Sequence, residues 1–176
     1  MTTKLALLAI GSFALTSLNS ADENVSVRAL DQLKTLTGNW EGTFAWTGAR
    51  TATGAMNATY YTTGNGSAVV ENLIAEKAPV MTTVYHLDGA DLRMTHFCAA
   101  QNQPRLKATQ IDLAKGTIDF GFVDITNLRS PDAPHVHGLE MHLIDPNHLT
   151  VIFLFRGEGK ESRERIDLKR VEIKPS

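Results

Sequence analysis

The sequence has little cysteine and no excess of charge of either sign. Its 176 residues include one cysteine, Cys98, which excludes an internal disulfide, a cysteine-rich zinc site and a Cys-x-x-Cys redox pair. The 17 basic residues nearly balance the 19 acidic ones, and no segment gathers enough lysine and arginine to form the positive surface that nucleic acid requires. We therefore expect no nucleic-acid partner. The chain also lacks a Gly-x-Ser-x-Gly motif, so no activated serine nucleophile is indicated.

The N-terminal residues have the pattern of a secretory signal peptide. Lys4 precedes an apolar stretch from Leu5 to Leu15, and small polar residues follow up to Ala21. The stretch is too short to span a membrane, although an N-terminal core helix is the alternative interpretation. No other stretch approaches the roughly eighteen apolar residues of a spanning helix. We expect a signal peptide at 1–21 and one domain at 22–176, exported to the periplasm or secreted, with no membrane insertion afterwards.

The rest of the chain predicts an all-β domain after one short helix. Between residues 25 and 36, leucine and valine recur every third position, which indicates an amphipathic helix. Beyond it, short segments rich in Thr, Val, Ile, Phe and Tyr alternate with turn residues about every ten positions, as in an antiparallel barrel. We expect a ten-stranded antiparallel up-and-down β-barrel, with strands at 39–46, 52–62, 67–74, 80–87, 92–98, 106–113, 117–124, 135–143, 149–155 and 161–171.

The connections between these strands are of two kinds. Tight turns are expected at Gly64-Asn65-Gly66, Asp88-Gly89, Lys115-Gly116 and Asp145-Pro146-Asn147. Longer connections are expected at 75–79, 99–105 and 125–134. In an up-and-down barrel the two sets lie at opposite ends, so one end is closed by hairpins and the helix. The other end should be a mouth lined by loops, where binding residues are often carried.

The start of the first strand is Gly38-Asn39-Trp40. Here the chain resembles the calycin group of barrels (lipocalins, fatty-acid-binding proteins and nitrobindins), whose first strand opens with Gly-x-Trp and whose last strand carries a basic residue over that tryptophan. The resemblance implies that Arg170, or else Arg165, packs on Trp40, and a guanidinium over an indole has its own physical basis. Ten strands are closer to fatty-acid-binding proteins or nitrobindins than to lipocalins. No histidine follows His148, so the haem-ligating histidine of nitrobindins has no match.

Strand alternation predicts which polar side chains face the interior, because successive residues point to opposite faces. By this argument three histidines and one aspartate gather at the mouth near Cys98, with Tyr85 on the neighbouring strand and Arg105 in the loop above. The expected ligand-binding residues are His96, Asp124, His135, His137, Tyr85 and Arg105. His86, His142 and His148 are expected outside. The run from Glu161 to Arg170 alternates in sign and is interpreted as the solvated face of the last strand.

This cluster supports more than one chemistry. His96, His135 and His137 with a carboxylate are suitable ligands for zinc or another divalent metal. The same groups are suitable for acid–base catalysis near neutral pH, in a metal-assisted hydrolase or an isomerase. Haem is a further alternative, and Cys98 is expected to be a small buried hydrophobe rather than a reactive thiol. We favour a barrel that holds a small, partly apolar molecule over an enzyme, as a monomer or a homodimer.

Overall fold

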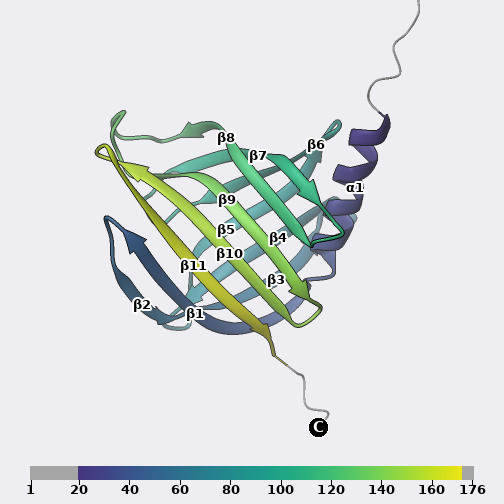
Figure 1. Cartoon of the computed structure of the whole chain (residues 1–176), viewed down its shortest axis with the longest axis horizontal. Helices are drawn as coiled ribbons and strands as arrows, with labels where there is room; N and C mark the ends of the chain where they lie inside the picture. Colours follow the sequence, from purple (N-terminus) through teal and green to yellow (C-terminus); the bar gives the residue numbers. More distant parts are fainter. Residues whose placement is uncertain (1–19, 172–176) are drawn as a thin grey trace, which may run out of the picture.

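A computed structural model of the chain describes residues 20–171 and shows a closed β-barrel with one helix (Figure 1). Helix α1 spans Ser20–Lys34. The strands are β1 (Gly38–Gly48), β2 (Ala52–Ala55), β3 (Asn57–Thr63), β4 (Ala68–Ala75), β5 (Ala78–Asp88), β6 (Asp91–Phe97), β7 (Gln103–Asp112), β8 (Thr117–Thr126), β9 (His135–Asp145), β10 (His148–Gly157) and β11 (Lys160–Arg170). The predicted signal peptide lies outside the described residues except for its last two positions, which belong to α1.

The strands form one antiparallel sheet that closes on itself. Each strand from β3 to β11 pairs with the next one along the chain, and β1 pairs with β11 to complete the ring. β2 and β3 lie on β1 in one register, interrupted only at Met56, whose N–H still donates to the carbonyl oxygen of Gly42 at 3.0 Å. The two segments therefore act as one strand. The predicted closed ten-stranded antiparallel barrel is confirmed.

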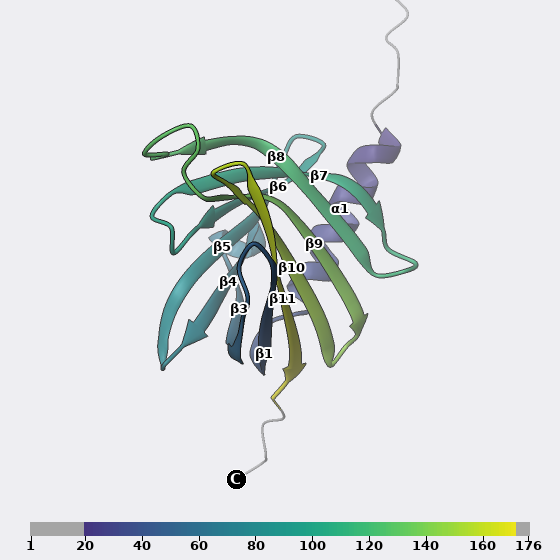
Figure 2. The same cartoon turned by 60° about the vertical axis from the view of Figure 1, so that its left-hand side comes forward.

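The two ends of the barrel differ (Figures 1 and 2). At one end α1 packs against β3 to β7, and it buries Ala29, Leu30 and Leu33 in the hydrophobic core. The opposite end carries the connections β1–β2, β4–β5, β6–β7, β8–β9 and β10–β11. The loops at 98–102 and 127–134 are longer than a tight turn, as expected. The predicted division into a closed end and a loop-lined mouth therefore holds.

One of the predicted mouth loops is shorter than expected. Ala75 pairs with Ala78, so only Glu76 and Lys77 connect β4 to β5. Both have positive φ angles, of 51° and 71°, the backbone conformation of a two-residue hairpin that twists with its strands. Asparagine and glycine usually mark such a turn, and neither is present here. Without that signal, the sequence predicted a longer loop at 75–79.

The closed end contains the pair implied by the calycin resemblance. The guanidinium carbon of Arg170 lies 4.4 Å from the centre of the Trp40 ring. The same guanidinium donates to the carbonyl oxygens of Thr35, Thr37 and Pro146 at 2.8–2.9 Å. Arg170 therefore ties the last strand to the end of α1 and to the β9–β10 turn. Arg165 instead pairs with Asp167 on the outer surface, so Arg170 is the matching cation.

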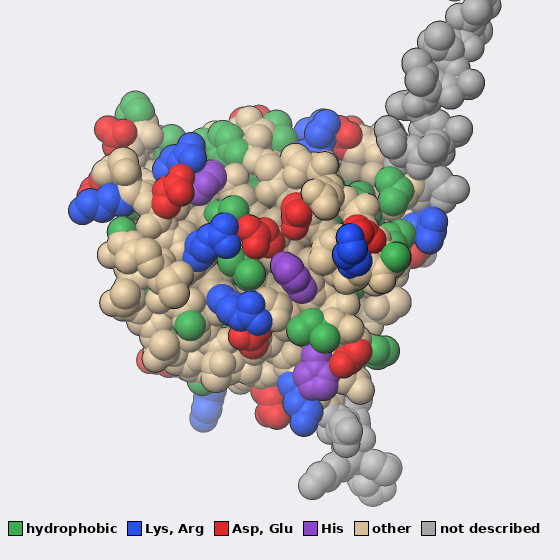
Figure 3. Space-filling model, in the orientation of Figure 1, with side chains coloured by type: hydrophobic (Ala, Val, Ile, Leu, Met, Phe, Trp, Pro, Cys, Tyr) green, Lys and Arg blue, Asp and Glu red, His purple; other side chains and the backbone are tan. Residues whose placement is uncertain are grey.

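The outer surface carries charges of both signs close together. Figure 3 shows basic and acidic side chains interspersed over one face of the barrel. Several are paired across or along strands, such as Arg163 with Glu140 and Arg156 with Glu161. This arrangement agrees with the near balance of charge in the sequence. Within residues 20–171, no helix has the length and apolar character needed to cross a membrane.

Candidate functional site

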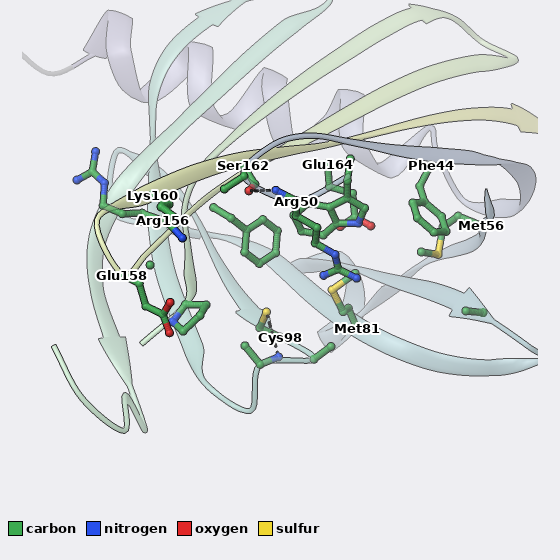
Figure 4. Close-up of a pocket in the computed structure, with 18 residues that line it drawn as sticks. Phe44, Arg50, Met56, Met81, Cys98, Arg156, Glu158, Lys160, Ser162 and Glu164 are labelled. Atoms are coloured by element: carbon green, nitrogen blue, oxygen red, sulfur yellow. Dashed lines mark hydrogen bonds between the residues drawn. The ribbon is translucent and has the colours of Figure 1, made fainter. Parts of the chain in front are cut away.

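A cavity of about 670 Å³ opens at the mouth of the barrel (Figure 4). Its walls are mainly apolar and come from strands β1, β5 and β10 and from the residue between β2 and β3. They include Phe44, Trp46, Met56, Met81 and Phe155. The rim is made by the mouth connections at 49–50, 98–100 and 157–160 and by Pro134. A cavity of this size and lining is typical of a site for a small organic molecule.

Glu164 is the buried carboxyl group of this cavity. Its side chain is 3% exposed, because strand alternation on β11 points it inward with Ile166 and Leu168. One of its oxygens, Oε2, has no hydrogen-bond partner in the part of the chain that the structure describes. Burial raises the pKa of Glu164 to about 7, and the charge of Arg50 and the Trp46 indole offset part of that rise. Glu164 therefore exchanges its proton near neutral pH inside the cavity.

Arg50 brings a positive charge to the same wall. It lies in the β1–β2 connection, where its backbone N–H donates to the Ser162 hydroxyl at 3.1 Å. Its guanidinium carbon lies 4.2 Å from the centre of the Trp46 ring, in a cation–π contact, and its side chain points into the cavity in Figure 4. Trp46 also packs against Phe155, with ring centroids 4.7 Å apart. The guanidinium, the indole and the Glu164 carboxyl group thus occupy one corner of the cavity.

Cys98 lines the cavity as a buried thiol. It is 8% exposed, and its sulfur accepts a long hydrogen bond of 3.5 Å from the N–H of Ala100. Burial raises the pKa of the thiol, and the neighbouring charge of Glu164 raises it further. The thiol is therefore neutral at physiological pH, which favours its interpretation as a small apolar lining residue.

Deeper in the barrel, a row of buried polar side chains crosses four neighbouring strands. Tyr60, Glu71, Thr83 and His96 are successive cross-strand partners on β3, β4, β5 and β6. Tyr85 donates to Glu71 at 2.6 Å, and the Thr83 hydroxyl contacts Nδ1 of His96 at 2.9 Å. We call these four cross-strand partners, together with Tyr85, the interior polar row. None of them is more than 2% exposed.

Burial controls the charge of the interior polar row. It raises the pKa of Glu71 to about 7, against the opposing effect of the hydrogen bond from Tyr85, and it lowers the pKa of His96 to about 3. Within the described residues, the hydroxyl of Tyr60, Oε1 of Glu71 and Nε2 of His96 have no hydrogen-bond partner. The His96 ring packs on Phe153, with centroids 4.8 Å apart. His96 is therefore a neutral imidazole in an apolar setting.

Two of the predicted site residues face the interior. Tyr85 and His96 point inward as strand alternation predicts, although both belong to the interior polar row and neither lines the cavity. Their predicted contact with a ligand stays a prediction. Cys98, expected beside the cluster, does line the cavity.

Asp124 and Arg105 lie on the outer surface, and the inward placement of Asp124 was wrong. They form a two-bond ion pair at 2.5 and 2.7 Å, and each side chain is about half exposed. The cause is a β-bulge, since Leu106 pairs with Phe122 whereas Arg105 pairs with Asp124. Val123 is the extra residue on β8, and it reverses the faces of the residues that follow.

A second bulge explains why His135 and His137 also face outward, contrary to prediction. Phe155 pairs with Val136 and Leu154 pairs with Gly138, so His137 is the extra residue on β9. Val136 takes the inward position and is completely buried. His135 contacts the carbonyl oxygen of Ala133 at 2.8 Å, and His137 borders a separate hollow of about 240 Å³ with Leu154 and Arg163.

The structure therefore does not bring the predicted histidine cluster together. His96 lies inside the barrel, while His135 and His137 lie outside it. Among residues 20–171 there is no group of three or more His, Cys, Asp or Glu side chains arranged to hold a metal ion. The three-histidine metal site, which was one alternative for the predicted cluster, is not formed by these side chains.

Sequence reasoning missed the groups that do line the cavity. Glu164 was included in the alternating charged run Glu161–Arg170 and interpreted as solvated. Strict alternation with Ile166 and Leu168, however, places Glu164 on the inward face. That signal was available in the sequence. Arg50 is in the β1–β2 turn, where the alternation of a strand does not apply and so cannot predict the direction of the side chain.

Comparisons with known proteins agree with the fold. No protein-family model matches the chain, and no curated protein matches it. Among solved structures it is similar to Rv2717c from M. tuberculosis, with a TM-score of 0.52 and 17% identity over 82% of this chain and 98% of the other. It is also similar to a DUF3598 family protein from Nostoc punctiforme PCC 73102, with a TM-score of 0.53 and 11% identity over 80% of this chain and 49% of the other.

Identities this low show the fold alone. The closed ring of strands, the Trp40–Arg170 pair and these structural neighbours define the fold as a calycin-like β-barrel. A closed barrel of this width leaves an interior that a small molecule can enter.

Proposed function

We propose that this protein binds a small, partly apolar molecule in the cavity at the mouth of its barrel. The observation that carries the proposal is the cavity itself, about 670 Å³ with walls that include Phe44, Trp46 and Met81. Few polar groups converge on it, chiefly Arg50 and Glu164. Apolar walls with a small number of placed polar groups are typical of small-molecule sites.

We favour ligand binding over the alternative in which the predicted histidine cluster catalyses a reaction. Acid–base or metal-assisted chemistry there requires His96, Asp124 and His135 within reach of one substrate. Asp124 and His135 are on the outer face of the wall, and His96 is inside it. The residues around the cavity instead support recognition of a ligand.

The two tryptophans make the proposal easy to test. Trp46 lines the cavity, whereas Trp40 lies at the closed end under Arg170. Titration with decan-1-ol, a neutral apolar probe, is expected to change the intrinsic fluorescence saturably. The change should disappear in Trp46→Phe and persist in Trp40→Phe. The probe should also slow alkylation of Cys98, the only thiol in the chain.

A matched pair of substitutions on β5 tests the location. Met81 faces the cavity, and its neighbour Val80 is exposed on the outer wall. Met81→Trp fills the cavity and is expected to weaken decan-1-ol binding about tenfold or more, since it removes most of the apolar contact. Val80→Trp should bind as the parent does. Equal affinity in the two variants, with both folded by circular dichroism, would refute binding in this cavity.

We further propose that the protein acts after export, on the basis of its N-terminal pattern. Lys4 and the apolar stretch from Leu5 to Leu15 support cleavage near Ala21. Expressed in a bacterium, the full chain is expected in the periplasmic extract with a mass that lacks the first residues. Leu7→Arg interrupts the apolar stretch and should retain the chain in the cytoplasm. An uncleaved cytoplasmic protein in both cases would contradict export.

A further inference from the structure

The corner of the cavity around Glu164 has the features of a cation-binding site. Glu164 is 3% exposed and lines the cavity, and one oxygen of its carboxyl group has no hydrogen-bond partner among residues 20–171. A buried carboxylate oxygen left unpaired is unfavourable, and a positively charged donor is the group that relieves it most. The unpaired acceptor inside a cavity is therefore an observation that points to a ligand.

An aromatic ring stands beside that carboxyl group. Trp46 and Glu164 are direct cross-strand partners on β1 and β11, so the indole and the carboxyl group are fixed next to each other by the sheet. Trp46 is 7% exposed, and the ring of Phe155 packs against it with the two ring centroids 4.7 Å apart. An aromatic face next to a carboxylate is the combination that binds organic cations in proteins.

The chain already places one of its own cations on this corner. The Arg50 guanidinium lies 4.2 Å from the Trp46 ring centre, and its positive charge lowers the pKa of Glu164. Arg50 is nevertheless exposed, and among residues 20–171 its guanidinium makes no hydrogen bond or ion pair. A ligand can replace an exposed guanidinium that makes no hydrogen bond.

The other charged groups of the cavity are at its rim. Arg156 is exposed and pairs with Glu161 at 2.9 Å, which satisfies its guanidinium. Glu158 and Lys160 are exposed on either side of the tight β10–β11 turn. Glu164 is thus the buried charge among the described lining residues. This distribution favours a cationic ligand over an anionic one.

We propose that the cavity selects molecules that carry an organic cation, such as a primary ammonium group, next to an apolar chain. The cation displaces the Arg50 guanidinium from the Trp46 ring and pairs with Oε2 of Glu164, while the chain lies against Phe44, Met56 and Met81. This inference rests on the proposed function, since it names the class of ligand for the same cavity.

Three probes of equal chain length separate the inference from the proposed function. Decylamine, decan-1-ol and decanoate each have ten carbons, and their head groups are positively charged, neutral and negatively charged. At about pH 8, where the amine keeps its proton, decylamine is expected to bind at least tenfold more tightly than the other two. If decan-1-ol binds and decylamine binds no better, the proposed function stands and the cation site is refuted. If no probe binds, the proposed function itself fails.

The pH dependence identifies the carboxyl group. Glu164 has a pKa of about 7 and must be ionised to pair with the ammonium. At about pH 6 roughly one-tenth of the protein has an ionised Glu164, so decylamine affinity should fall about tenfold between pH 8 and pH 6. Decan-1-ol affinity should not change over this range.

Substitution of Glu164 provides the matched control. Glu164→Gln is expected to abolish both the preference for decylamine over decan-1-ol and its pH dependence, so that the two probes bind with similar affinity. Glu158→Gln removes a carboxylate from the rim of the same cavity and should leave both effects in place. Loss of the preference in Glu158→Gln, or its survival in Glu164→Gln, would overturn the assignment.

Arg50 tests the displacement. Arg50→Ala removes the competing cation, so decylamine should bind several-fold more tightly at about pH 9, where Glu164 stays ionised even without the guanidinium. Arg156→Ala, at the rim, should have no such effect. If Arg50→Ala weakens decylamine, or if the parent protein prefers decanoate and loses it in Arg50→Ala, the cavity is an anion site and the inference is wrong.

Discussion

The hydroxyl of Tyr85 donates a 2.6 Å hydrogen bond to the carboxyl group of Glu71, and both side chains are completely buried in the middle of the barrel. Glu71 lies in the protein interior, and none of the basic side chains of residues 20–171 forms an ion pair with it. Burial raises its pKa to about 7 despite that hydrogen bond. A protonated carboxyl group in the core makes the stability of the barrel depend on pH.

The parent protein is expected to lose stability as pH rises because of Glu71, and Glu71→Gln should not show this loss. Between about pH 4.5 and pH 7 the unfolded chain releases the Glu71 proton while the folded chain keeps it, so the free energy of unfolding falls as pH rises. The shift from 4.5 to about 7 corresponds to ~3 kcal/mol at most. Urea unfolding at about pH 4.5 and about pH 7.5 measures this difference. Glu41→Gln, at an exposed position, should keep the parent's dependence, and parallel curves for Glu71→Gln and the parent would refute the assignment.

His96 is expected to act in the opposite direction. Its folded pKa of about 3 is below the usual 6.5, so the unfolded chain takes up a proton first and stability falls as pH falls below about 6.5. Between pH 7 and pH 4 this costs ~3 kcal/mol. His96→Phe, which keeps a ring against Phe153, should lose this acid sensitivity, whereas His142→Phe on the outer wall should not. An unchanged acid sensitivity in His96→Phe would show that another group causes it.

The fold was predictable because its signals are local. Alternation of apolar residues and turns such as Asp88-Gly89 defined the hairpins, and Gly38-Asn39-Trp40 with Arg170 identified how the barrel closes. The inward direction of His96 followed from the same alternation, and the mouth followed from the lengths of the connections. The pairing of Arg170 with Trp40 was implied by the resemblance to calycins, and the other predictions depend on residue patterns within one strand or turn.

The site was less predictable because two bulges interrupt that counting. Val123 and His137 are each an extra residue in a strand, and each reverses the faces of the residues between it and the mouth. Neither position carries a glycine or another residue that marks a bulge. Strict alternation therefore assigned Asp124, His135 and His137 to the inner face of the barrel wall. In the structure the two bulges place all three side chains on the outer face.

Arg170 should be among the most important charged residues for stability. It stacks on Trp40 and donates to three carbonyl oxygens that join α1, β11 and the β9–β10 turn. We expect Arg170→Ala to lower the free energy of unfolding by about 2 to 4 kcal/mol. Arg170→Lys should recover only part of this, because an ammonium group lacks the planar fork.

The control for Arg170 is an arginine with a single surface pair. Arg163 contacts Glu140 at 3.4 Å with its side chain exposed, so Arg163→Ala should cost less than about 1 kcal/mol. Urea unfolding followed by Trp fluorescence measures both variants. If Arg170→Ala costs no more than Arg163→Ala, the pair at the closed end does not stabilise the barrel.

Gly42 lies on β1 directly against the backbone of β11. A Cβ atom added there would stand 1.9 Å from the backbone carbonyl oxygen of Asp167 on β11, a contact that only movement of the strand can relieve. Gly54 is the matched control, because a Cβ there meets the ring of Phe44 at 2.7 Å, and a side chain can move aside. We expect Gly42→Ala to cost about 2 to 3 kcal/mol and Gly54→Ala less than about 1 kcal/mol.

Hydrogen exchange locates the effect of these substitutions. Because β1 and β11 form the pairing that completes the ring, Gly42→Ala should speed exchange of the β1 and β11 amides before those of β6 and β7. Gly54→Ala should leave the β1–β11 amides protected. Uniform loss of protection around the barrel would contradict this expectation. It would mean that the β1–β11 pairing opens together with the other strands and not before them.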